Sequence, residues 1–418
     1  MSLSHFPVVR PVVLAWALAL AGADVSAAPL TLDQALQQAV QSYPALAAQQ
    51  ARVDAARQAQ IPAAELPDPK LGIGIENFPV SGPNAGSLTA DFMTMQRISL
   101  LQEVPNADKR RARREVADAR VAEAGAGQLV LRREVRRDTA LAWITRITVE
   151  KKLAWFGQLE QENRLLATTV RARIASGQAQ LAEAVVPQQE ALKLADQRDD
   201  LQAQQQQAVA GLRRWLGPTA DGAQDTSWPS WPVGRAALQA RLHQHPELRA
   251  FEPREQVLAA EVREAEAAKH PDWGVELAYQ RRGQQFGDMV SLEFGFDLPL
   301  FTERRQDPRI AAKQAERIGL AAERESMLRS HTEELERDLA EYERLERISN
   351  RQRDALLPLL ETKLNLLLTS YGAGQSSLAE LVFARAERQA AHLQLIELEG
   401  QRSLAAARLH FIFGEDAE

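Results

Sequence analysis

The chain has 418 residues, with 50 Lys and Arg against 56 Asp and Glu, so its formal net charge is −6. That balance argues against a nucleic-acid partner, because such binding depends largely on neutralising phosphates. The chain contains no cysteine, which excludes disulfides, thiolate metal sites, cysteine nucleophiles and a lipid anchor on an N-terminal cysteine.

Residues 1–27 predict a signal peptide. Arg10 supplies positive charge, residues 12–23 are small or apolar, and Val25-Ser26-Ala27 fits the cleavage pattern. The alternative is a buried N-terminal helix, but nothing amphipathic accompanies the apolar run. We therefore expect an exported, non-lipidated protein of a Gram-negative envelope.

The rest of the sequence repeats itself at a long period. Gly177-Gln178 followed by Leu181-Ala182-Glu183 returns as Gly374-Gln375 followed by Leu378-Ala379-Glu380. This self-similarity predicts two copies of one structural unit, over residues 28–217 and 236–418. Residues 218–235, rich in Pro, Gly and Trp, join them and are expected to be packed.

Each half predicts one very long helix followed by a returning helix. Residues 106–176 lack proline and are rich in helix formers, which gives about 105 Å of helix at 1.5 Å per residue. Residues 309–371 repeat the feature, with a kink expected at Pro358. Each long helix should end at a glycine, and its narrow apolar stripe leaves most of the surface polar.

Four shorter segments alternate apolar and polar residues with period two, which predicts strands. They cover residues 71–75, 92–104, 273–280 and 290–298, and form two hairpins with loops at 77–91 and 281–288. Trp273 and Tyr279 bracket the apolar stripe of the third strand, as aromatic residues do at the two interfaces of a membrane barrel.

These elements predict a mainly α-helical protein with a small β part. In a soluble α+β domain the apolar strand faces would pack on helices, but a helical rod covers little of two hairpins at its end. Four strands also cannot close a membrane barrel, since the smallest bacterial barrels have about eight. We therefore expect a transmembrane β-barrel shared between subunits, continued by a hollow α-helical barrel.

The order of hairpins, long helices and glycine turns, given twice after a signal peptide, resembles the TolC-like outer-membrane factor family of tripartite efflux systems. The resemblance covers the mature chain. It implies a homotrimer with a 12-stranded barrel, a periplasmic adaptor protein and an inner-membrane RND-type pump. Residues 102–110 and 66–69 are more similar to its heavy-metal cation branch. Many relatives carry a lipidated cysteine, which this chain lacks.

The same resemblance directs attention to the two helix-hairpin turns. Gly177, Leu181, Gly374 and Leu378 match the family's tip motif and are candidate adaptor-docking residues; alternatively, the glycines are only C-caps. Glu183 and Glu380 are candidate pore-entrance carboxylates that favour cations. The alternative is that both acids only stabilise a helix start. Trp273 and Tyr279 are the candidate membrane-interface aromatics.

Other motifs carry weaker hypotheses. Met93 and Met95 make a poor Cu(I) site without a third soft ligand. His243 and His245 are not expected to share a helix face, so no metal site is predicted. The basic run at 109–114 fits a solvated or interhelical ion-paired face better than a lipopolysaccharide contact.

No catalytic motif is present in the sequence, so we predict neither an enzyme nor a cofactor. The leading prediction is a passive outer-membrane efflux duct in contact with outer-membrane lipid, serving heavy-metal cations. Alternatives are a drug-efflux or type I secretion duct, or a periplasmic coiled-coil adaptor or scaffold without a pore.

Overall fold

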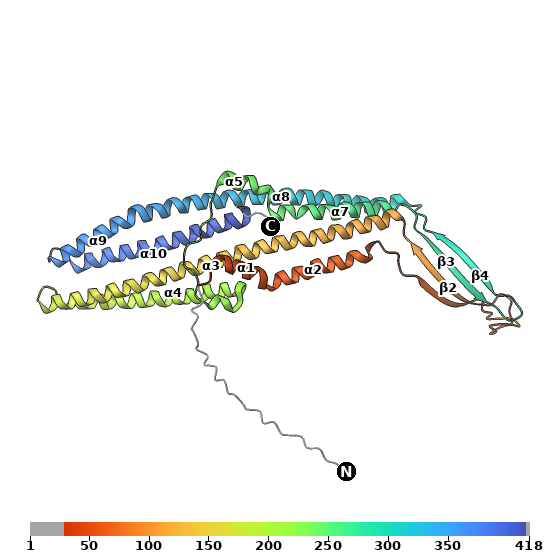
Figure 1. Ribbon diagram of the computed structural model, residues 1–418, viewed down its shortest axis with the longest axis horizontal. Coiled ribbons are helices and arrows are strands. Elements are labelled where there is room, and N and C mark those ends of the chain that lie inside the picture. Colours follow the sequence, from red (N-terminus) through yellow and green to blue (C-terminus); the bar gives the residue numbers. More distant parts are fainter. Residues whose placement is uncertain (1–28, 415–418) are drawn as a thin grey trace, which may run out of the picture.

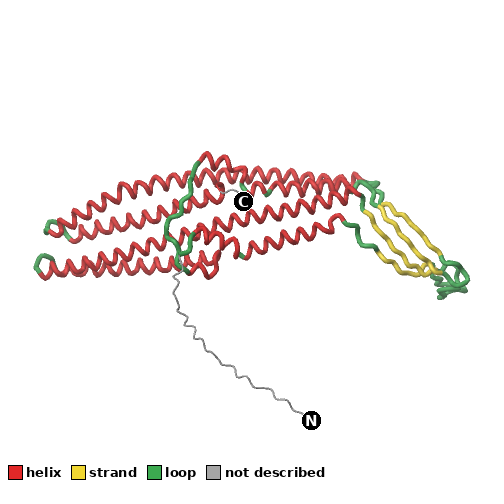
Figure 2. Tube along the Cα trace, viewed as in Figure 1, coloured by secondary structure: helices red, strands yellow, loops and turns green. Residues whose placement is uncertain are grey.

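The protein is long and narrow, with helices along most of its length and a sheet at one end (Figures 1 and 2). The computed structural model describes residues 29–414, and the predicted signal peptide lies outside them. Within residues 29–414, no helix is both long enough and apolar enough to cross a membrane.

The elements recur in the same order in the two halves of the chain. The α-helices are α1 (Leu32–Ser42), α2 (Pro44–Gln60), α3 (Ala107–Ala175), α4 (Val186–Leu216), α5 (Arg235–Arg241), α6 (Pro246–Arg249), α7 (Phe251–Ala267), α8 (Thr302–Arg351), α9 (Leu357–Gly372) and α10 (Leu378–Leu409). The strands are β1 (Lys70–Glu76), β2 (Met95–Val104), β3 (Trp273–Arg281) and β4 (Met289–Phe296).

Helix α3 confirms the predicted long helix of the first half. Its 69 residues correspond to about 104 Å at 1.5 Å per residue. Asn106 begins the helix as an N-cap whose side chain accepts the N–H of Lys109 at 2.8 Å. The chain reverses at Gly177, whose φ of 72° is readily adopted only by glycine.

The corresponding helix of the second half begins earlier than predicted. Helix α8 starts at Thr302 and contains Pro308, whereas the prediction placed the start at residue 309. Pro308 lies near the N-terminus, where it removes one helical hydrogen bond without ending the helix. Residues 352–356 form a π-helical turn just before Pro358, where a kink was predicted, and α9 follows it. Gly374 then reverses the chain with a φ of 75°.

The four strands form one antiparallel sheet in the order β1-β2-β3-β4. Helices α2, α3, α7 and α8 adjoin these strands in the sequence and pack in the same order, α2 on α3, α3 on α7 and α7 on α8. The sheet therefore continues directly into a helical layer. Strand β2 begins at Met95, three residues after the predicted start, because Phe92 to Thr94 form a turn.

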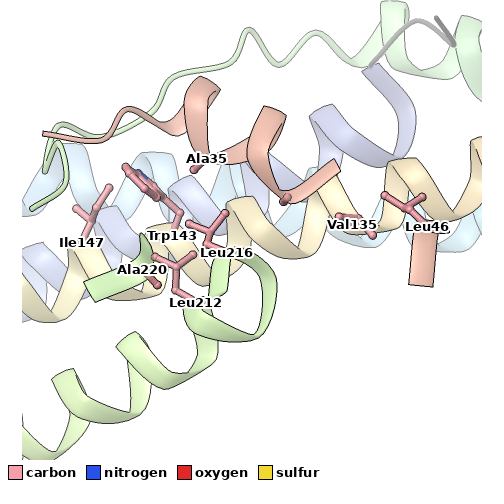
Figure 3. Packing of buried hydrophobic residues seen from close by; sticks show 9 residues of the cluster. Ala35, Leu46, Val135, Trp143, Ile147, Leu212, Leu216 and Ala220 are labelled. Carbon is pink, nitrogen blue, oxygen red and sulfur yellow. The ribbon is translucent and has the colours of Figure 1, made fainter. Parts of the chain in front are cut away.

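The helices are held together by small apolar clusters along their length. The cluster of Figure 3 joins α1, α3 and α4 through residues such as Ala35, Trp143 and Leu212. A second cluster joins the two helix hairpins and contains Val170 of α3 and Leu381 of α10. These separate seams match the predicted narrow apolar stripes.

The segment between the halves is packed, as predicted. Trp228 and Trp231 lie against the cluster of α1, α3 and α10. The Trp228 indole N–H donates to Glu399 Oε2 at 3.0 Å. The joint is therefore fixed by both apolar packing and a polar contact.

Candidate functional site

The sheet has one continuous apolar face. The cross-strand register aligns Ile73 with Ile98, Ile98 with Tyr279, and Tyr279 with Val290. Most of these side chains are exposed to solvent in the single chain. Its apolar residues are Leu71, Ile73, Ile75, Ile98, Leu100, Val104, Trp273, Val275, Leu277, Tyr279, Val290, Leu292, Phe294 and Phe296, and the polar Gln96, Gln102 and Arg281 lie on the same face. A band of this kind is what a transmembrane strand presents to lipid.

The opposite face of the sheet is mainly polar or small, apart from Met95, Leu101 and Met289. Arg97 of β2 contacts Glu76 Oε1 of β1 at 2.5 Å and Glu276 Oε1 of β3 at 2.6 Å, and so links three strands. Glu293 of β4 lies directly opposite Glu276. The charged residues of this face are Lys70, Arg97, Glu76, Glu103, Glu276 and Glu293. Acidic groups therefore outnumber basic groups on this face.

Both outer edges of the sheet lack a strand neighbour among the described residues. Strands β1 and β4 each pair on one side only, and the helices repeat this arrangement. Helix α2 packs along α3, and α8 packs along α7 and α10, so α2 and α8 lie at opposite edges of the layer. Open edges of this length are ready to pair with another chain.

The two predicted interface aromatics lie at opposite ends of β3. Trp273 pairs with Phe296 at the end adjoining the helices, and Tyr279 lies near the hairpin loop, where its hydroxyl bonds to Asp288. Both are partly exposed. They bracket the apolar face as the sequence predicted, and their role at a membrane interface stays a prediction.

The predicted tip residues differ in accessibility. Gly177 and Gly374 form the turns at the ends of the two helix hairpins (Figure 2). Leu181 is 80% exposed, whereas Leu378 is only 4% exposed because it packs in the cluster between the hairpins. Of the two leucines, Leu181 is therefore the accessible one.

Glu183 and Glu380 both complete capping boxes. Glu183 Oε1 accepts the N–H of Gln180 at 3.2 Å, and Glu380 Oε2 accepts the N–H of Ser377 at 2.9 Å. The hydrogen bonds from the Ser377 N–H and hydroxyl lower the pKa of Glu380. Both carboxylates are thus held at the tips by their own backbone.

A contact that the sequence did not reveal ties the two tips together. The Arg173 guanidinium of α3 lies 4.2 Å from the centre of the Tyr371 ring of α9 and donates to the Tyr371 carbonyl. The Tyr371 hydroxyl donates to Glu183 Oε2 at 3.2 Å. Burial, and then the Glu183 charge, raise the pKa of Tyr371. Glu183 therefore joins the first hairpin to the second.

The basic run at the start of α3 is partly paired between helices, as predicted. Lys109 Nζ lies 2.6 Å from Asp272 Oδ2, and Arg113 Nε lies 2.9 Å from Glu264 Oε1 of α7. Met93 lies in the turn before β2, so Met93 and Met95 do not occupy one strand.

The predicted separation of His243 and His245 is confirmed, because His243 is exposed and His245 is buried. The sequence analysis nevertheless did not predict that His245 lies next to His331. Its ring centroid lies 4.0 Å from that of His331 on α8, and Glu247 completes a group of three possible metal ligands. No local spacing signals this group, because His331 is distant in the chain.

Comparison with solved structures places this architecture among channel proteins. A membrane protein from Pseudomonas aeruginosa matches with a TM-score of 0.77 and 16% identity, covering 92% of this chain and 90% of that chain. CusC, a transmembrane channel, matches with a TM-score of 0.75 and 15% identity, covering 92% of each chain. The Campylobacter jejuni CmeC outer-membrane channel matches with a TM-score of 0.74 and 11% identity, covering 92% of this chain and 87% of that chain. This chain has the outer-membrane channel fold. That result confirms the predicted mainly helical architecture with its small sheet.

No protein-family model matches the chain, and no curated protein matches its sequence. The fold is therefore established through its three-dimensional arrangement.

Proposed function

We propose that the chain is the outer-membrane subunit of a tripartite efflux system and that three copies form a passive exit duct. The observation that carries this proposal is a four-stranded sheet with one apolar face, one mainly polar face and two edges that have no strand partner within residues 29–414. Three such sheets supply twelve strands, enough for a barrel whose apolar face meets lipid and whose polar face meets water.

The energetics favour closure between copies. Each unpaired backbone group in hydrocarbon costs several kcal/mol, so an open four-stranded sheet is unstable in a membrane. The helical part also exposes large apolar side chains in the single chain, including Ile61 after α2, Leu192 on α4, Ile318 on α8, and Leu359 and Leu366 on α9. Contact with neighbouring subunits removes these surfaces from water.

Purified full-length protein in detergent tests this proposal. We expect a trimer by light scattering and stable ion conductance in planar bilayers. In cells, the protein should fractionate with the outer membrane as a heat-modifiable oligomer. A stable soluble monomer recovered from the periplasm would instead support the alternative of a scaffold without a pore.

We further propose that the hairpin tips dock a periplasmic adaptor and that the adaptor connects the duct to an RND-type pump. Exposed Leu181 is the strongest contact candidate, whereas buried Leu378 supports the tip from within. Leu181→Glu should reduce adaptor cross-linking and export without loss of trimers. Unchanged cross-linking would remove Leu181 from the interface.

Glu183 and Glu380 give the proposed trimer six carboxylates near its periplasmic mouth, which would favour cations. Glu183→Gln with Glu380→Gln should reduce cation preference in reversal-potential measurements. Glu333→Gln, an exposed acid distant from the tips along α8, is the matched control. Unchanged cation preference in the double variant would leave both acids with only their capping role.

For the transported species we propose heavy-metal cations. The similarity of residues 102–110 to the metal branch supports this, as does the acidic excess on the polar face of the sheet. A deletion strain should lose resistance to Cu, Ag, Zn, Co or Cd. Selective loss of drug resistance, or of protein secretion, would favour the corresponding alternative duct. The proposed duct is passive, so we assign it no enzymatic step and no cofactor.

A further inference from the structure

A buried polar cluster lies where the second half of the chain begins, away from both the sheet and the tips. His245 caps α6 and receives the N–H of Glu247 on its Nδ1 at 3.2 Å. His331 reaches the same place from the middle of α8. Both histidines are only 6% exposed, and Phe413 of the C-terminal segment packs near both rings.

His331 is held between two carboxylates. Its Nε2 lies 3.2 Å from Glu247 Oε2, and its Nδ1 lies 3.3 Å from Glu334 Oε2. Glu247 is on α6 and Glu334 is on α8, one turn from His331. Each ring nitrogen therefore faces a carboxylate oxygen, which explains why the ring is tolerated in this buried position.

We propose that His245, Glu247 and His331 form a binding site for a divalent transition-metal ion of the Zn²⁺ class. One ligand atom from each residue lies within 4.8 Å of the other two. An ion at the centre of such a group is at most about 2.8 Å from each atom, so inward shifts of less than about 1 Å, together with a rotation of the His245 ring, reach the 2.0–2.2 Å typical of zinc.

Two details of the contacts match a metal centre. In a tetrahedral zinc site, neighbouring nitrogen and oxygen ligands are about 3.3 Å apart, and His331 Nε2 and Glu247 Oε2 are 3.2 Å apart. Metal-bound histidines usually donate their second ring N–H to a carboxylate, and Glu334 occupies that position. Glu334 is thus a positioning residue for His331.

The surroundings allow exchange of a proton for an ion. Loading releases the proton between His331 and Glu247 to solvent and leaves the ion on the freed nitrogen and oxygen. Because the two rings are tilted by 38° with their centroids 4.0 Å apart, His245 must also turn about its side-chain bonds to aim a ring nitrogen at the ion. A cavity of about 20 Å³ borders His245 and Glu247, which is room for one water as a fourth ligand.

Charges from α3 also face this cavity. Arg133, Glu134 and Arg137 line it, and Arg137 Nε contacts Asp138 Oδ1 at 2.8 Å. These two acids offset the two arginines near the proposed ion. A bound ion would join α6 to α8 and fix the start of the second half. This role does not depend on the proposed duct.

The test uses full-length protein in detergent, stripped with a chelator and titrated with Zn²⁺ or Co²⁺. We expect one ion per chain by mass spectrometry, an intense tetrahedral Co²⁺ absorption band, and a higher melting temperature with Zn²⁺. His245→Gln and His331→Gln should abolish all three signals, and Glu334→Gln should weaken binding about 10–100-fold. His243→Gln, exposed and two residues from His245, is the matched control.

Wild-type protein that retains no ion, or a His331→Gln variant that binds as tightly as wild type, would overturn the proposal. Glu247→Gln keeps the side-chain volume and replaces a ligand, so it decides the question if a histidine variant fails to fold. Unaltered Zn²⁺ binding by folded Glu247→Gln protein would equally contradict the assignment.

Discussion

Replacing Gly400 with alanine should separate two helices that meet in the protein interior. Gly400 of α10 faces Thr148 of α3, and a Cβ at Gly400 would lie 3.0 Å from Thr148 Cγ2 and closer still to Oγ1. Thr148 cannot easily give way, because it is buried and its hydroxyl donates to the Ile144 carbonyl at 2.9 Å. Overpacking of this kind costs about 1–3 kcal/mol.

For a chain of this length, 2 kcal/mol corresponds to a drop of roughly 2–4 °C in the melting temperature. Circular dichroism at 222 nm in one detergent measures this drop. Thr148→Ala removes the clashing atoms and should cost about 1 kcal/mol alone. The double variant Gly400→Ala/Thr148→Ala should be more stable, by at least about 1 kcal/mol, than the sum of the two single effects predicts.

Gly157→Ala is the matched control, because Gly157 lies on α3 and a Cβ there meets nothing within 4 Å. That change should stabilise the helix by about 0.5–1 kcal/mol. If Gly400→Ala were tolerated as well as Gly157→Ala, or if the double variant were additive, the close approach of α3 and α10 would be refuted.

Three further predictions concern the helices. Leu381→Ala empties a fully buried position between the hairpins and should cost about 2–5 kcal/mol in denaturant unfolding; less than 1 kcal/mol would contradict that packing. Burial, and then Arg136, lower the pKa of His410 to about 4. In the unfolded chain His410 binds a proton near pH 6.5, which the folded chain does not do until about pH 4. The free energy of unfolding should therefore fall as the pH drops from 6.5 to 4. In melting scans, His410→Gln should reduce the fall in melting temperature between pH 6.5 and pH 4. An unchanged dependence of the melting temperature on pH would exclude His410 as its cause. Tyr371→Phe removes the bond to Glu183 and should raise bilayer conductance, whereas unchanged conductance would show that this bond does not restrain the mouth.

The elements that the sequence predicted well are those set by local chemistry. Helix α3 follows from a proline-free run with an Asn cap, and Gly177 and Gly374 end their helices because they adopt positive φ. The period-two pattern also separated the two faces of β1, β3 and β4. The predicted start of α8 at residue 309 was wrong, because this helix begins at Thr302 and continues through Pro308.

The missed features depend on contacts between distant segments. The burial of Leu378 and the Arg173–Tyr371 contact require the two halves to lie side by side. The pairing of His245 with His331 requires the start of α6 to pack on the middle of α8, within the second half. Spacing along one chain does not encode such distances. The candidate tips could therefore be located from the sequence, but their accessibility and mutual ties could not.

Cross-linking of the sheet edges tests the proposed closed ring most directly. The cysteine-free chain allows Gly74→Cys in β1 to be combined in turn with Ser291→Cys, Glu293→Cys or Gly295→Cys in β4, all on the polar face. One register should yield disulfide-linked species of two and three chains and none larger. Ile73→Cys, on the opposite face of β1, should not cross-link with the same partners. Monomers in every register, or a ladder continuing beyond three chains, would contradict the closed three-subunit barrel.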